Sequence, residues 1–108
     1  MSRYIEIPAA SLPAAGARTL LQVGGHSIAL FNVDGTYYAI DDRCPHAGAS
    51  LFTGILTGRV VQCRAHGLRF DLATGCMPSA PGFGVRAYAI ETEGDQVFIA
   101  LPATEECS

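Results

Sequence analysis

The chain has 108 residues, of which 49% are hydrophobic and 16% charged, and its formal net charge is −3. This length and composition predict one folded domain and exclude a disordered chain. The negative charge argues against a nucleic-acid partner and an anionic membrane surface. Apolar runs are far shorter than a spanning helix and no secretory signal is visible, so we expect a cytoplasmic protein. We also expect it to be a monomer.

Short β-strands separated by glycine and proline turns are predicted along the chain. The expected strands are 4–7, 19–23, 27–33, 36–40, 59–63, 68–71, 85–91 and 96–101. Gly24-Gly25 and Asp34-Gly35 mark tight turns, and one helical turn is expected within 8–16. No segment carries a sustained helical period, so the chain is predicted to be all-β.

The sequence pattern changes between about 42 and 83, where glycine and proline become frequent and alternation of apolar residues is sparse. We expect one domain over 1–108, with a base built from both ends of the chain. Residues 42–83 would form a loop-rich insert between the strands of this base. Function should lie in the insert, because loops on a rigid scaffold usually carry it.

The insert contains two Cys/His pairs, Cys44-Pro45-His46 and Cys63-Arg64-Ala65-His66, separated by 16 residues. Thiolate and imidazole are ligands for zinc, copper and iron–sulfur clusters. A zinc finger pairs cysteine with cysteine on one element and histidine with histidine on another. Each pair here contains one cysteine and one histidine. This arrangement is expected if two loops hold a cluster with cysteines on one iron and histidines on the other.

At these residues the chain resembles the Rieske ferredoxin family, and the resemblance runs nearly end to end. The matching motifs are Cys44-Pro45-His46-Ala47-Gly48-Ala49, Gly58-Arg59-Val60-Val61-Gln62-Cys63, His66-Gly67-Leu68-Arg69-Phe70-Asp71, Thr74-Gly75 and Pro78. The resemblance implies a Rieske fold, with a β-sandwich-like base domain and a small loop-rich cluster-binding subdomain. It also implies that Cys44, His46, Cys63 and His66 bind one [2Fe–2S] cluster.

The implied function is electron transfer, not catalysis by this chain alone. The resemblance implies that a flavin-dependent NAD(P)H reductase supplies one electron and that a terminal oxygenase receives it. Rieske proteins of cytochrome bc complexes resemble this chain but carry bridging cysteines where it has Ala49 and Ala65. They also place a serine at the position of Leu68. These departures point to a low-potential ferredoxin of a bacterial aromatic-ring dioxygenase, because one hydroxyl donor to the cluster is missing.

Two other functions fit part of the pattern. The small subunit of an assimilatory nitrite reductase resembles this fold, although some such subunits lack ligands that are present here. A zinc-stabilised binding module would use the same residue types, and the colour of the purified protein would separate it from a Rieske protein.

The remaining chemistry-bearing residues have simpler interpretations. The histidines and a reducing compartment argue against pairing the four cysteines in disulfides, with Cys76 expected in a turn and Cys107 in the tail. His26 is expected in a solvated turn, and Asp41 and Asp42 in turn formation. Packing roles are expected for Tyr37, Tyr38, Phe70, Phe83, Tyr88 and Phe98.

Overall fold

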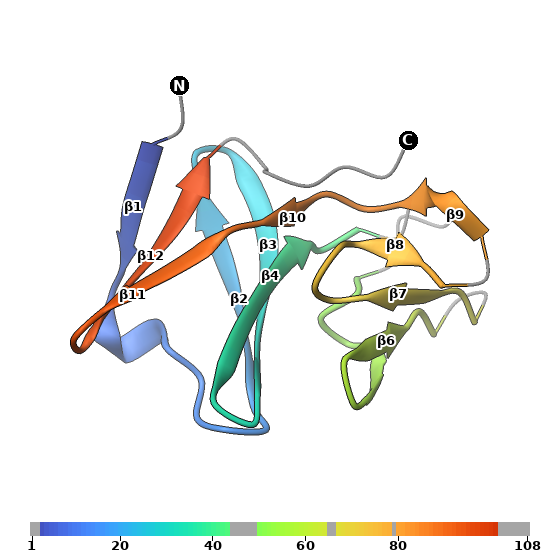
Figure 1. Ribbon diagram of the computed structural model, residues 1–108, viewed down its shortest axis with the longest axis horizontal. Helices are drawn as coiled ribbons and strands as arrows, with labels where there is room; N and C mark the ends of the chain where they lie inside the picture. The colour runs from blue at the N-terminus through green and yellow to red at the C-terminus, as the bar shows by residue number, and fades with distance from the viewer. Residues whose placement is uncertain (1–2, 44–49, 65–66, 79, 102–108) are drawn as a thin grey trace.

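The computed structural model describes residues 3–43, 50–64, 67–78 and 80–101, and strands account for most of them (Figure 1). In chain order the elements are β1 (Arg3–Ile7), the 3-10 turn η1 (Ala9–Ser11), β2 (Arg18–Val23), β3 (His26–Val33), β4 (Thr36–Asp41), β5 (Ile55–Thr57), β6 (Val60–Gln62), β7 (Arg69–Asp71), β8 (Cys76–Met77), β9 (Ala80–Gly84), β10 (Ala87–Tyr88), β11 (Ile90–Glu93) and β12 (Gln96–Leu101). The all-β prediction is confirmed. None of the described residues belongs to a helix long and apolar enough to cross a membrane.

The described strands form four antiparallel sheets, ordered β1-β12-β11, β10-β4-β3-β2, β5-β6-β7 and β8-β9. The first two sheets contain strands from both ends of the chain and lie together at one end of the molecule (Figure 1). The two smaller sheets come from the middle of the chain and lie at the other end. Cys63, which directly follows β6, therefore belongs to a distinct end of the fold.

Strand β3 is buried on both faces and separates two cores. Ile28 and Leu30 face a base core, whereas Ala29 and Phe31 face an insert core, and all four side chains are fully buried. The base core comprises Ile7, Leu21, Ile28, Leu30, Ala39, Tyr88, Val97, Ile99 and Leu101. The insert core comprises Ala29, Phe31, Ile40, Leu51, Val61, Cys63, Phe70, Leu72, Val85 and Ala87. Burial on both faces explains why β3 is a continuous apolar run without alternation.

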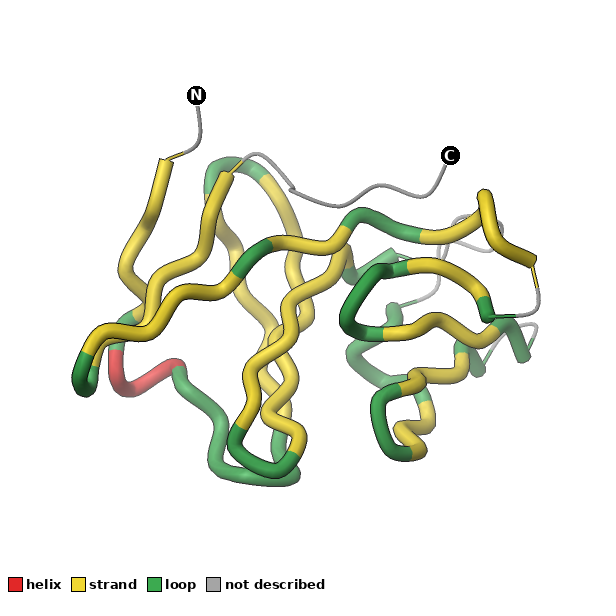
Figure 2. The backbone as a smooth tube through the Cα atoms, viewed as in Figure 1, coloured by secondary structure: helices red, strands yellow, loops and turns green. Residues whose placement is uncertain are grey.

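The prediction of one strand over 85–91 is wrong, because the chain changes sheets within that segment. Strand β10 pairs with Ala39 and Ile40 of β4, whereas β11 pairs with β12. Ala89 lies between them in a short loop (Figure 2), and its carbonyl accepts the Ala100 N–H at 3.0 Å. The segment's apolar pattern continues across this break, so the sequence does not reveal it. Strands β5 and β8 were not expected either, since they have only three and two residues, and β9 was not expected because its sequence APGFG contains a proline and two glycines.

Candidate metal centre

Cys63 lies at the foot of the second ligand loop, defined here as residues 63–68 between β6 and β7. Its side chain is fully buried in the insert core beside Val61 and Phe70. The Cys63 N–H donates to the Leu68 carbonyl at 2.7 Å, and its own carbonyl accepts the Gly67 N–H at 2.9 Å. These two bonds close the loop into a tight connection. They fix the Cys63 backbone, and its thiol is shielded from water.

Glycine is required near the end of this loop. Gly67 has a φ of 70°, a left-handed conformation that other residues rarely adopt. A Cβ atom at Gly67 would also lie 3.3 Å from the Gln62 amide nitrogen, which is tighter than ordinary contact. The left-handed backbone at Gly67 therefore permits the tight turn that closes the second ligand loop.

The first ligand loop, residues 43–50, is closed at its base by Asp42. The Asp42 carboxylate is only 8% exposed and accepts the Ser50 hydroxyl at 2.8 Å and the Phe52 N–H at 2.9 Å. Its carbonyl accepts the Leu51 N–H at 2.5 Å, and Arg43 forms a bridge with Ser50. Asp42 is thus a buried loop clamp, which corrects its interpretation as a solvated turn residue. The signal available in the sequence was its position between the end of a strand and a ligand loop.

The two loops are also connected to each other. Arg64, which follows Cys63, donates from Nε to the Thr53 carbonyl at 2.5 Å, just beyond the first loop. From the base, Arg18 donates to the carbonyls of Phe52 and Gly54 at 2.9 and 2.7 Å. These bonds hold the segment after the first loop against both the second loop and the base, without the bridging cysteines that Ala49 and Ala65 exclude.

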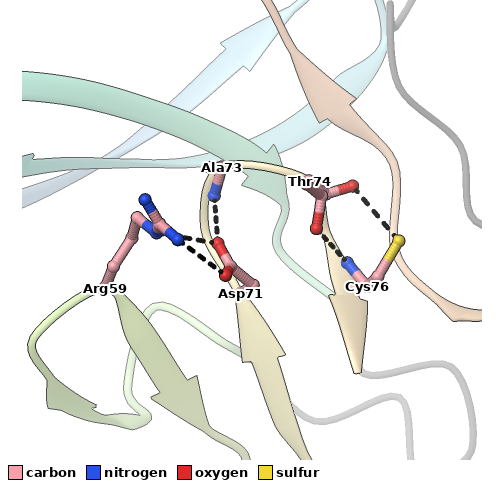
Figure 3. Close-up of polar contacts among 5 residues, drawn as sticks. All are labelled: Arg59, Asp71, Ala73, Thr74 and Cys76. Atoms are coloured by element: carbon pink, nitrogen blue, oxygen red, sulfur yellow. Dashed lines mark hydrogen bonds and ion pairs between the residues drawn. The ribbon is translucent and has the colours of Figure 1, made fainter. Parts of the chain in front are cut away.

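The Thr74-Gly75 motif shapes the chain between β7 and β8 (Figure 3). Asp71 accepts the Ala73 N–H at 2.8 Å and forms an ion pair with Arg59, Nε to Oδ1, at 3.1 Å. This hydrogen-bonded pairing raises the pKa of the Arg59 guanidinium. The Cys76 N–H donates to Thr74 Oγ1 at 3.1 Å. The motif is therefore a structural turn beside the ligand loops.

Cys76 departs from its expected state. Its sulfur lies 3.8 Å from the Thr74 carbonyl oxygen, and Cys76 is disulfide-bonded. The expectation that the cysteines avoid disulfides is thus wrong for Cys76. That expectation rested on the redox compartment and on neighbouring histidines, neither of which reports the distance between two sulfurs.

His26 and Asp41 belong to a polar cluster between β3, β4 and β10. The ring of His26, the first residue of β3, meets the Tyr88 ring edge-on at 6.2 Å, so His26 is half-buried and not a solvated turn residue. Asp41 accepts the Tyr88 hydroxyl at 2.5 Å and pairs with Arg86 at 3.1 Å. Burial, followed by this hydrogen bond, raises the pKa of Tyr88. Both residues stabilise the base near the insert.

Most of the expected aromatic packing is observed, with one exception. Phe70 and Tyr88 are buried, and Tyr37 and Tyr38 pack against the two cores. Phe83 is 61% exposed, so its predicted packing role is wrong. It lies in the short strand β9, which the sequence did not reveal.

Of the four predicted ligands, Cys63 lies within the described residues, whereas Cys44, His46 and His66 lie outside them, as does Cys107. In the described ranges, no three His, Cys, Asp or Glu side chains gather as metal ligands. Leu51 at the end of the first loop and Cys63 at the start of the second belong to the same insert core. A cysteine thiolate at this position is a ligand type that suits a soft metal or an iron–sulfur cluster.

The family comparison matches residues 2–89 to the Rieske [2Fe–2S] domain. The chain is 37% identical to the 3-phenylpropionate/cinnamic acid dioxygenase ferredoxin subunit of Escherichia coli K12, over 97% of this chain and 99% of that protein. It is 30% identical to a chain in the complex of reduced oxygenase and oxidized ferredoxin in carbazole 1,9a-dioxygenase, covering 95% and 97% of the two chains with a TM-score of 0.80. A Mycobacterium tuberculosis protein named as a nitrite reductase small subunit shares 23% identity over 96% of this chain and 99% of its own, with a TM-score of 0.82, which shows the fold alone.

Proposed function

This chain belongs to the Rieske [2Fe–2S] domain family, and from that premise we propose that it carries electrons to the terminal oxygenase of an aromatic-ring dioxygenase. It binds a [2Fe–2S] cluster, which supplies a one-electron couple when bound. The chain is an electron carrier and not itself an oxygenase. The work of its own residues is to hold the cluster, exclude water from one side of it and present the other side to partners.

The proposed ligands are Cys44, His46, Cys63 and His66. The observation that carries this assignment is the burial of Cys63 in the same core that anchors the end of the first loop. Two thiolates and two neutral imidazoles match the donor set of a Rieske centre. Asp42 and Arg64 support the assignment, because they fix the bases of the two loops that carry these residues.

The electron donor in this proposal is a flavin-dependent NAD(P)H reductase, and the carrier works in the cytoplasm as a monomer. The names of the relatives, a dioxygenase ferredoxin subunit and an oxygenase–ferredoxin complex, support the oxygenase as acceptor. Residues 1–108 would form one domain with a cluster-binding insert at about 42–83. The Cα radius of gyration, 12.9 Å, agrees with about 13 Å for a single domain of this length.

The nitrite reductase alternative has weaker support, because the relative that carries this name matches at 23% identity. The zinc-binding alternative has no support from the comparisons, since the matching family binds [2Fe–2S].

Iron and sulfide analysis of ligand variants tests the proposal. We expect about two irons and two sulfides per wild-type chain, and loss of both in Cys44→Ser, Cys63→Ser, His46→Ala and His66→Ala. Cys76→Ser is the matched cysteine control and should keep the cluster. Full iron content in Cys63→Ser would refute the ligand assignment. Retention of the cluster without reduction by any flavin reductase, or without oxidation by an oxygenase, would refute the electron-transfer role.

A further inference from the structure

Charge is divided unevenly between the two ends of this molecule. Within 42–83 there are four arginines and two aspartates, a net charge of +2, whereas the rest of the chain carries −5. In the described residues, ion pairs involve only Arg59 and Arg86. Arg43, Arg64 and Arg69, termed the loop arginines, are exposed. A chain that is acidic overall therefore has a cationic insert.

The loop arginines flank both proposed cysteine ligands. Arg43 precedes Cys44, and Arg64 follows Cys63. Arg69 pairs with Gln62, the residue before Cys63, across β6 and β7. Beside it lies a groove of about 400 Å³, lined by Ile55, Thr57, Val60, Gln62, Arg69 and Pro78. Positive charge and apolar surface are thus presented together, a combination typical of protein interfaces.

We propose that the loop arginines dock an acidic surface around the flavin of the electron-donating reductase. This inference rests on the proposed function, because it places the cluster between the two ligand loops. Two ferric ions, two sulfides and two thiolates sum to zero, so reduction takes the charge of the insert from +2 to +1. One electron leaves the reduced flavin and enters the carrier, and no covalent bond forms or breaks.

This change in charge identifies the donor, and not the acceptor, as the acidic partner. An acidic surface binds the more positive, oxidised carrier more tightly and releases it after reduction. That preference suits a reductase, whose substrate is the oxidised carrier and whose product is the reduced one. An acidic oxygenase would instead retain the spent carrier.

Reduction by two free flavins tests whether the electrostatic potential near the cluster is positive. Reduced FMN and reduced riboflavin share one redox ring, but FMN adds a phosphate. At low ionic strength we expect FMN to reduce the holoprotein about two- to fivefold faster, despite the net charge of −3. The ratio should approach one at about 0.5 M salt, because salt screens exposed charges. A slower reaction with FMN at low salt would overturn the proposal.

Arginine variants locate the effect. Arg43→Gln and Arg69→Gln should each lower the FMN-to-riboflavin ratio at low salt, while riboflavin rates stay unchanged. Arg3→Gln removes the same charge from β1, at the opposite end of the molecule (Figure 1), and should leave the ratio unaltered. An equal effect of Arg3→Gln would mean that net charge governs the rate, and would overturn the proposal. Iron and sulfide content, measured first, shows separately whether the proposed cluster site has failed.

A polyanion tests the preference for the oxidised carrier. Because binding and reduction are linked, saturating poly-L-glutamate should lower the reduction potential of the holoprotein. A preference of about fourfold corresponds to a fall of about 35 mV for a one-electron couple. The fall should disappear in the Arg43→Gln, Arg69→Gln double variant. A rise in potential would assign the acidic partner to the acceptor side and overturn the proposal.

Discussion

The Asp42 carboxylate accepts a hydrogen bond from the Ser50 hydroxyl at 2.8 Å, across the first ligand loop. The same oxygen, Oδ1, accepts the Phe52 N–H. One buried side chain thus holds together two segments of the chain that enter and leave the loop carrying Cys44 and His46. Its removal would release the loop base and also leave the part-buried Phe52 N–H without its acceptor.

We expect Asp42→Ala to lower the free energy of unfolding by about 2–4 kcal/mol and to reduce iron content. Ser50→Ala removes only one of the two hydrogen bonds that Asp42 Oδ1 accepts and should cost about 1 kcal/mol or less. Asp42→Asn keeps an acceptor oxygen and should retain the cluster. Urea unfolding and iron analysis measure these effects. Equal losses in Asp42→Ala and Ser50→Ala would show that Asp42 does not clamp the loop.

The sequence predicted the hairpins around Gly24-Gly25 and Asp34-Gly35, because turn residues and flanking β-branched residues act locally. It could not predict the change of sheet at Ala89, because that depends on which distant strand each half of the segment pairs with. It also could not reveal that Asp42 is buried, since a carboxylate is usually solvated unless specific donors surround it. The ligand pairs were visible because metal chemistry restricts both residue type and spacing.

Gly75 is required by close packing as well as by its backbone conformation. It has a φ of 78°, and a Cβ atom there would collide with the Val85 carbonyl, while the Val85 N–H donates to the Gly75 carbonyl at 2.9 Å. We expect Gly75→Ala to destabilise the protein by more than about 3 kcal/mol. Gly58→Ala is the control, because Gly58 has a φ of 60° but open space around it. Its cost should be about 1 kcal/mol in the same unfolding assay, and an equal cost for both variants would contradict the packing argument.

Tyr88 predicts a loss of stability at alkaline pH. Burial and the hydrogen bond to Asp41 raise its folded-state pKa above the ordinary 10.0. The neutral phenol is therefore favoured in the folded state, and its contribution is complete below pH 10 and falls as the pH rises toward the folded-state pKa. We expect a slope of up to about −1.4 kcal/mol per pH unit above pH 10 from this residue. Tyr88→Phe should remove it, whereas Tyr4→Phe, at an exposed site, should not.

Leu68 predicts a low reduction potential. Its backbone carbonyl closes the second ligand loop, and its side chain packs against the insert core. A hydroxyl at this position would donate to the cluster and stabilise the more negative, reduced state. We expect Leu68→Ser to raise the potential by roughly 40–60 mV relative to Leu68→Ala, which loses similar packing without adding a donor. Film voltammetry measures both potentials. Equal potentials in the two variants would show that a hydroxyl at position 68 does not raise the reduction potential.

The most direct test of the Rieske assignment is electron–nuclear double resonance of the reduced protein labelled with ¹⁵N-histidine. The chain has three histidines, and His26 lies in β3 beside Tyr88. The account predicts strong coupling of the unpaired electron to nitrogens of two histidines, unchanged in His26→Gln. A reduced cluster that shows no strongly coupled histidine nitrogen would contradict ligation by His46 and His66.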